Sequence, residues 1–448
     1  MNTTSSASPP SSTEASRRRT RAQQRPVTWP LRFSALVLTL GVLLLPLMMG
    51  NRTPETLTAS LLALVLIAIA AAVVPITTGD IRPPSTTWLW FGGIVTALVV
   101  LQAWPSTWLA GLFGPYPADF WEHSPVTPQY WSPDPGATLR GWAAFAALFA
   151  VAWLGRSLPR QLRTWVLLAV VVSALFQALY GVLAHAGGAQ TIFGIWERHG
   201  TDWVHGSYSN RNLFAAYLAL VWPLSVGIWY VQGVPVLGKL PVELRVTGSV
   251  LCGAIIGAAM LGSGSRLGAA AGGFGVLLAL ILWGRHRRLI HGASAWPAYL
   301  AAAAAMVAAT WYGLTPLAER LLATTGEESR LDVFRAMLFD FPLAWWIHGV
   351  GLGGFEAVFK QYQPAGVSGW WDYAHNDLLQ WGVEMGVAGA LLLGAAATAL
   401  IRRFRMNTER IALYAGLAAL CLVALGDFSW HIPGTQVVLA FYIGALLR

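Results

Sequence analysis

The feature that most constrains the fold is a near-continuous series of apolar stretches that begins at residue 31. A helix needs roughly 17 to 25 apolar residues to cross a bilayer, and about twelve stretches satisfy that length. Only 11% of the 448 residues are charged and the mean hydropathy is +0.55, values that are foreign to soluble domains of this size. The sequence therefore predicts an all-α polytopic membrane protein. The expected spans are residues 31–50, 57–76, 86–104, 138–155, 164–185, 211–231, 246–262, 267–284, 295–314, 377–401, 409–425 and 433–447.

Short basic clusters predict the orientation of these spans. Cytoplasmic loops of membrane proteins carry an excess of Lys and Arg. If the N-terminus is cytoplasmic, every cluster falls on the same side, and both termini are cytoplasmic. The net charge of +9 then reflects membrane topology and not nucleic-acid binding. We expect residues 1–30 to be a disordered basic cytoplasmic tail and residues 31–448 to form the transmembrane domain. The clusters include Arg17, Arg18, Arg19, Arg156, Arg160, Arg163, Lys239, Arg245, Arg285, Arg287, Arg288, Arg402, Arg403, Arg405 and Arg410.

Three longer loops lie on the predicted outer side, at residues 105–137, 187–210 and 315–376. Loops above roughly fifteen residues in a compact protein are more often functional than idle. We therefore expect a periplasmic working face, with short helices in the longest loop. The first loop is rich in Trp, Tyr, Phe and Pro. This composition suits an aromatic belt at the membrane interface, which is the commoner case, or a stacking surface for sugar rings.

Arginines near the predicted outer membrane edge indicate an anionic ligand. Arg266 lies in "GSGSRLGAAAGG", a connection too short for a loop, where an arginine must snorkel or meet an anion. Arg330 and Arg335 flank Asp332 in "ESRLDVFRAMLFDFP", which predicts an amphipathic helix on the membrane surface. These two arginines can pair with neighbouring acids, or they can bind a lipid diphosphate.

Two further polar groups stand at expected helix ends. Asn210, Arg211 and Asn212 begin the sixth span, where Ser209 or Asn210 can cap the helix. A cap leaves the other polar side chains unexplained. Asp427 and His431 follow the eleventh span in "GDFSWHIP", and a simple connecting turn is the simpler interpretation of that segment.

The segment "DYAHNDLLQWGVEMG" at residues 372–386 combines a polar stripe with a histidine. Asn376, Gln380 and Glu384 recur at i, i+4 and i+8, so they share one helix face, which must meet protein and not lipid. His375 stands at the N-terminal end of the tenth span. The position suits a neutral imidazole acting as a general base, although a histidine at a helix end is more often structural.

Several common catalytic motifs are missing from the sequence. We find no D-x-D pair, no carboxylate-rich Mg²⁺ motif, no H-E-x-x-H and no Walker A sequence. We therefore expect neither a metal nor a cofactor, and the energy for a reaction must come from the substrate. A membrane-borne diphosphate leaving group held by arginines, with a histidine to deprotonate an acceptor hydroxyl, satisfies these observations.

These residues carry a family resemblance. The segment "AHNDLLQWGVEMGVAG" at residues 374–389 resembles the H-N-x-x-L-Q-x-x-x-E-x-G-x-x-G signature of the bacterial O-antigen ligase and polymerase family. Upstream, "SYSNRNLFAAYLAL" resembles the N-x-N-x-x-A segment of the family, and "GSGSRLG" resembles its S-R step. "SRLDVFRAMLFDFPLAWWIHGVGLGGF" resembles its arginine followed by P-x-x-G-x-G. Together the motifs cover residues 206–389, in the order of the family.

The resemblance implies an inner-membrane glycosyltransferase with a GT-C-like fold. Such an enzyme takes a glycan from undecaprenyl diphosphate, without a metal, and transfers it with inversion to a hydroxyl of lipid A core or of a growing polysaccharide. By residue match, Arg266 and Arg330 bind the diphosphate and His375 activates the acceptor. A protein O-oligosaccharyltransferase and a flippase or transporter of lipid-linked sugars remain alternatives. The implied or candidate substrate-binding residues are Asn210, Arg211, Asn212, Arg335, Asn376, Gln380 and Glu384.

Overall fold

The computed structural model describes residues 27–48, 54–81, 83–113, 129–198, 202–231, 235–286 and 328–448. Within these ranges the chain is mostly helical, and nine helical segments are long and apolar enough to cross a membrane. The predicted all-α polytopic class is therefore confirmed. The helices concerned are α2 (Trp29–Leu44), α3 (Pro54–Thr77), α4 (Thr86–Ala103), α6 (Pro135–Ser157), α7 (Arg160–Ala186), α8 (Arg211–Gly227), α10 (Val242–Gly262), α11 (Arg266–His286) and α16 (Asp377–Arg402).

Two shorter helices occupy the last two expected spans, α17 (Thr408–Val423) and α18 (Pro433–Leu446). The expected span at 295–314, most of the N-terminal tail and parts of all three long loops lie outside the described residues. The total of about twelve spans therefore stays a prediction. The remaining elements are η1 (Leu45–Leu47), α5 (Thr107–Phe113), β1 (Thr191–Ile192), β2 (Trp196–Glu197), η3 (Ile228–Tyr230), α9 (Pro235–Lys239), α13 (Glu328–Arg335), η4 (Ala336–Asp340), α14 (Leu343–His348), α15 (Phe355–Tyr362) and η5 (Ser429–His431).

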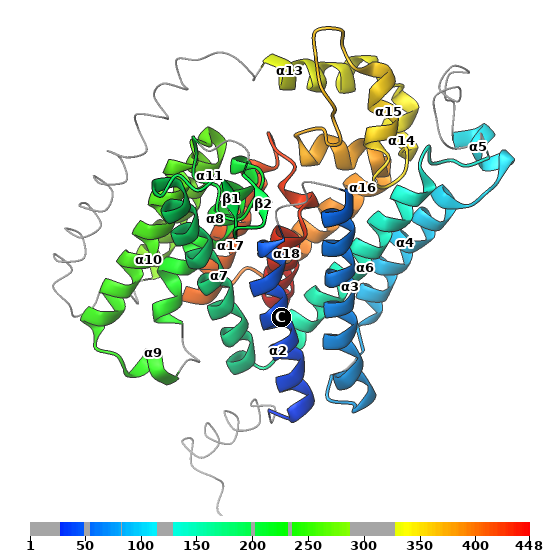
Figure 1. Cartoon of the computed structure of the whole chain (residues 1–448). Helices are drawn as coiled ribbons and strands as arrows, with labels where there is room; N and C mark the ends of the chain where they lie inside the picture. Colours follow the sequence, from blue (N-terminus) through cyan, green and yellow to red (C-terminus); the bar gives the residue numbers. More distant parts are fainter. Residues whose placement is uncertain are drawn as a thin grey trace, which may run out of the picture.

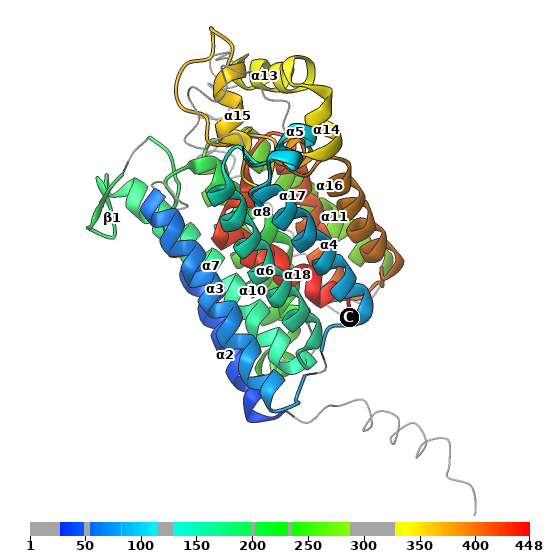
Figure 2. The ribbon, with the colours of Figure 1, turned by 90° about the vertical axis from the view of Figure 1, so that its right-hand side faces the viewer.

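Helix α8 forms the centre of the bundle and packs against α10, α11 and α17, while α18 packs against α6 (Figures 1 and 2). Glycines allow the closest approaches. A Cβ atom added at Gly416 of α17 would collide with the backbone carbonyl of Leu220 in α8, and one at Gly444 of α18 with that of Ala152 in α6. Small residues permit this backbone contact between membrane helices, where lipid supplies little hydrophobic drive for association.

Several basic residues gather where α17 begins. Arg163 of α7 forms a buried ion pair with Glu409, with 2.8 Å between Nε and Oε1. Arg410 donates a hydrogen bond to the carbonyl of Arg403 over 2.8 Å, and Arg448 donates to that of Leu158 over 3.0 Å. Helix α17 separates this end of the bundle from the end that carries His375. Which end faces the cytoplasm remains a prediction from the basic clusters.

Four short elements, α13, η4, α14 and α15, form a cap over the end of the bundle where α16 begins (Figures 1 and 2). The cap has an apolar core of its own, built from buried side chains on all four elements. This cap is the described part of the expected loop at 315–376. Its core residues include Val333, Met337, Phe341, Trp345, Phe355 and Phe359.

The cap joins α16 at a break in that helix. Gly386 has φ 59° and ψ −154°, which interrupts the helix and exposes carbonyl groups of the preceding turn. The N–H of Val350 donates to the carbonyl of Val383 over 2.9 Å, and that of Gly351 to Glu384 over 3.0 Å. A Cβ atom on Gly386 would collide with the backbone at residues 347–349. Gly386 of α16 and Gly349 before residue 350 are therefore needed where the two backbones touch.

Candidate active site

The residue His375 directly precedes Asn376, the N-cap residue of helix α16. Asn376 caps the helix, because its Oδ1 accepts hydrogen bonds from the N–H groups of Leu378 and Leu379 over 3.1 and 3.0 Å. Its Nδ2 donates to the carbonyl of Leu425 over 2.9 Å, which ties the N-terminal end of α16 to the turn after α17. His375 itself has φ 53°, a left-handed conformation that is unfavourable for a residue with a side chain. Such strain persists where surrounding contacts impose it, often in functional sites.

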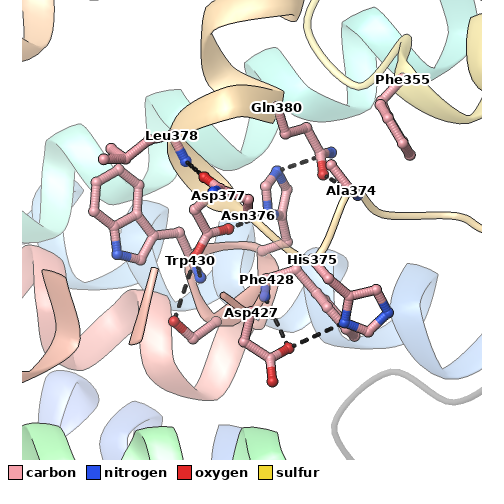
Figure 3. A network of polar contacts seen from close by, with 12 residues as sticks. Phe355, Ala374, His375, Asn376, Asp377, Leu378, Gln380, Asp427, Phe428 and Trp430 are labelled. Carbon is pink, nitrogen blue, oxygen red and sulfur yellow. Dashed lines mark hydrogen bonds and ion pairs between the residues drawn. The ribbon is translucent and has the colours of Figure 1, made fainter. Parts of the chain in front are cut away.

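The imidazole of His375 is held on three sides. Its Nδ1 lies 3.5 Å from Oδ1 of Asp427, and the side chain keeps 20% of its surface exposed (Figure 3). The rings of Trp371 and Phe428 meet it edge-on, with centroids at 5.1 and 4.7 Å. Asp427 therefore occupies the Nδ1 side, and Nε2 is the nitrogen that faces away from this carboxylate.

Asp427 connects His375 to an arginine. Its carboxylate is 3% exposed, and its Oδ2 lies 3.9 Å from Nη1 of Arg330. The same Nη1 donates a hydrogen bond to the carbonyl of Gly426 over 2.9 Å. The segment does connect α17 to α18, as expected, but it also brings Asp427 to two expected site residues. The sequence signal for a site at this segment was the presence of Asp427 and His431 between two apolar spans.

A second carboxylate, that of Asp377, contacts the same turn. Asp377, which was not among the expected site residues, accepts hydrogen bonds from Trp430 N–H over 3.0 Å and from His431 Nδ1 over 2.8 Å (Figure 3). Its own N–H donates to the carbonyl of Ala424 over 2.9 Å. Contacts at both ends of residues 424–431 therefore fix the turn that carries Asp427 to the start of α16.

The polar stripe continues this network into the protein. Asn376, Gln380 and Glu384 are all buried, as their spacing predicts. Gln380 accepts the N–H of Ala374 over 2.9 Å, and its Nε2 contacts Oε1 of Glu384 at 3.0 Å and Nε2 of His431 at 3.3 Å. These contacts join the stripe to Ala374, in the loop before α16, and to His431, in the segment between α17 and α18.

His431 lies in the connecting segment between α17 and α18, beside two buried carboxylates. Burial opposes its protonation, but the hydrogen bond to Asp377 and the negative charges of Asp377 and Glu384 outweigh that effect. The pKa of His431 is therefore raised above its ordinary value. The contact with Asp377 therefore ties His431 to the first residue of α16.

Arg266 begins helix α11 near the Asp427 turn. The next residue, Leu267, packs against Gly426, where an added Cβ atom would lie 2.9 Å from Leu267 Cδ2. Gly426 is the residue whose carbonyl accepts the hydrogen bond from Arg330. The fold therefore brings Arg330, His375 and the first turn of α11, which carries Arg266, to one short turn, although they come from different parts of the sequence.

Arg211 begins the neighbouring helix α8 at the same end of the bundle. Helices α8 and α11 are in close contact, because an added Cβ atom on Gly268 would lie 2.5 Å from Cβ of Ala215. The guanidinium of Arg211 stacks over the ring of Trp203 at 4.4 Å, and that ring packs on Gly264 just before Arg266.

The remaining expected residues have more local contacts. Asn210 caps α8 by accepting the N–H of Asn212 over 2.7 Å, which confirms one of the two capping options. Arg335 is largely exposed, and its Nη1 lies 3.9 Å from Oδ1 of Asp332, so it pairs with an acid of its own helix.

The comparisons with known proteins address this set of residues directly. Residues 251–394 match a family described as O-antigen ligase. This part of the chain is therefore similar to the O-antigen ligase family. The motif resemblance is thereby confirmed for residues 251–389, which contain Arg266, Arg330 and His375, whereas the N-x-N-x-x-A segment lies outside the match and stays a prediction. The family match supports an enzyme of the ligase or polymerase type in a membrane. No curated protein matches the chain at a significant level.

Proposed function

We propose that this O-antigen ligase family protein transfers a glycan from undecaprenyl diphosphate to a hydroxyl group of an acceptor sugar. The observation that carries the proposal is the meeting of His375 and Arg330 at the buried carboxylate of Asp427. One side of this carboxylate holds a base, and the other side holds a cation. That arrangement matches the two needs of the reaction, which are removal of a proton and stabilisation of a departing diphosphate.

In the proposed reaction, His375 accepts the proton of the acceptor hydroxyl at Nε2. The hydroxyl oxygen then forms the new glycosidic bond as the bond between the anomeric carbon and the diphosphate breaks. Asp427 keeps the Nδ1–H tautomer in place and stabilises the imidazolium that forms, as a carboxylate does for the histidine of a catalytic triad. The products are the extended glycan, undecaprenyl diphosphate and a proton held by His375.

The arginines act on the leaving group. Arg330 contacts the turn of Gly426 and Asp427, and Arg266 begins the helix whose Leu267 packs on that turn. We infer that a diphosphate bound at this turn meets both cations. Negative charge grows on the diphosphate as the bond breaks, and fixed cations stabilise it most in the transition state. Arg211, at the start of the adjacent helix, extends the positive region. The scheme uses only the energy of the lipid-linked donor.

A reconstituted transfer assay tests this function. Purified protein in liposomes is given a synthetic undecaprenyl-diphosphate oligosaccharide as donor, with EDTA present. Three acceptors are offered separately: lipid A core, a second lipid-linked oligosaccharide and a Ser-containing peptide. Transfer to a sugar acceptor supports the proposal and separates a ligase from a polymerase. Transfer to the peptide alone identifies a protein O-oligosaccharyltransferase. Movement of the donor across the bilayer without any transfer identifies a transporter, and it overturns the proposal.

A further inference from the structure

Two adjacent tryptophans stand between the cap and His375. The ring of Trp371 contacts that of His375, with centroids 5.1 Å apart, and lies 6.3 Å from that of Phe359 on α15. Trp370 precedes it and is 69% exposed. The two indoles line a shallow hollow, and one of them, Trp371, also contacts His375. The hollow is lined by Glu356, Phe359, Lys360, Gln363, Trp370 and Trp371.

Polar contacts hold the exposed indole of Trp370. Its Nε1 donates a hydrogen bond to Oε1 of Glu356 over 2.8 Å, and the ammonium of Lys360 lies 5.3 Å from its ring centroid. Gln363 Nε2 donates to the carbonyls of Val367 and Gly369 over 2.6 and 3.0 Å, which fixes the loop that presents the indole. An exposed aromatic ring that is already ordered loses little entropy when a ligand stacks on it.

The chemistry of this surface suits a sugar ring. The apolar C–H face of a pyranose packs on an indole. A carboxylate at its edge accepts hydrogen bonds from sugar hydroxyl groups, and an ammonium donates hydrogen bonds to them. The hollow has a volume of about 20 Å³, which is too small to enclose a sugar ring. A sugar must therefore lie across the mouth of the hollow, on the exposed face of Trp370.

We propose that Trp370 and Trp371, with Glu356 and Lys360, form the subsite that binds the acceptor glycan. This inference rests on the proposed transferase function. Arg330 meets the site at the turn of Gly426 and Asp427, where Leu267, the residue after Arg266, also packs, whereas Trp371 meets His375 from the loop before α16. An inverting displacement needs the attacking hydroxyl and the departing diphosphate on opposite sides of the anomeric carbon. The sugar on the tryptophans, beside the base, is therefore the acceptor.

A binding measurement without donor tests the subsite separately from catalysis. The full chain in nanodiscs is titrated calorimetrically with deacylated lipid A-core oligosaccharide and with soluble O-polysaccharide fragments. We expect one of these probes to bind, and Trp370→Ala to raise its Kd about tenfold or more through loss of the stacking face. Trp370→Phe retains an aromatic face and should retain most of the affinity. The matched control is Trp90→Ala, because Trp90 is 68% exposed on α4.

The outcomes separate this proposal from the transfer reaction. Binding that persists in His375→Ala and disappears in Trp370→Ala supports the subsite, even if wild type shows no transfer. Where transfer occurs, Trp370→Ala should raise the acceptor KM and leave the donor KM and kcat near their wild-type values. The subsite is overturned if no probe binds wild type, if Trp370→Ala binds like wild type, or if Trp90→Ala loses as much affinity.

Discussion

Oδ1 of Asp427 lies 3.5 Å from Nδ1 of His375, although the two residues belong to separate helix ends of the bundle. The other oxygen of the same carboxylate faces Arg330 at 3.9 Å. We propose that Asp427 in this position orients the imidazole and keeps the arginine in the site. The contact gives a specific role to a turn that would otherwise be only a connection.

Replacement of Asp427 by Asn tests that role. Asp427→Asn keeps the shape of the side chain but removes the charge that stabilises the imidazolium, so we expect kcat to fall about a hundredfold or more. The matched control is Asp332→Asn, because Asp332 is an exposed acid that pairs with Arg335 on the cap. Steady-state transfer kinetics in liposomes measure both variants. Equal activity of Asp427→Asn and wild type contradicts the orienting role.

The two ends of helix α11 provide a matched test of the diphosphate site. Arg266 begins the helix near Gly426, whereas Arg285 lies exposed in its last turn, at the other end. We expect Arg266→Ala to lower the transfer rate on the order of a hundredfold, because a cation is lost where charge develops on the leaving group. Arg285→Ala should change the rate little. The prediction fails if both variants transfer at the wild-type rate.

Gly386 is predicted to be essential for the joint between α16 and the cap. Gly386→Ala adds a methyl group at φ 59° against the backbone at residues 347–349, so we expect a loss of about 1–3 kcal/mol or more in unfolding free energy. Gly394→Ala in the same helix is the control, because its new methyl group meets nothing within 4 Å. That variant should be neutral or up to about 1 kcal/mol more stable. Chemical unfolding in detergent measures both. Equal stability of the two variants contradicts the proposed close contact.

The raised pKa of His431 predicts a dependence of stability on pH. A group whose pKa is higher in the folded protein stabilises the fold fully below its ordinary value of 6.5, and the contribution disappears as pH rises through the folded pKa. The difference in Tm between wild type and His431→Gln should therefore be largest at acidic pH and shrink towards alkaline pH. Thermal unfolding across the pH range checks this. A difference that grows with rising pH contradicts the sign.

The helices and the stripe of Asn376, Gln380 and Glu384 could be predicted because both depend on local periodicity. The partners of that stripe could not. Asp377 and Asp427 meet His431 and His375 across separate helices, and no spacing in the sequence reports such contacts. The break at Gly386 could not be predicted from the sequence either, because it depends on hydrogen bonds between carbonyls of α16 and the N–H groups of residues 350 and 351.

The role of the aromatic residues was also only partly visible. The loop at 105–137 attracted attention by composition, yet most of its length lies outside the described residues. Among the described residues, the indole that contacts His375 is instead Trp371, which follows Trp370 in the loop before α16. A tryptophan pair before a polar helix start does not by itself indicate a neighbouring base, because the contact depends on how α15 packs against that loop.

The most direct test of the account is the transfer rate of His375→Ala against wild type, in liposomes with the lipid-linked donor and the acceptor that wild type uses. We predict a fall of about 10²–10⁴-fold in kcat, because removal of the general base leaves the hydroxyl proton without an acceptor. Binding of the donor should persist, since Arg266 and Arg330 are intact. Transfer by His375→Ala at the wild-type rate would contradict the assignment of His375 as the base.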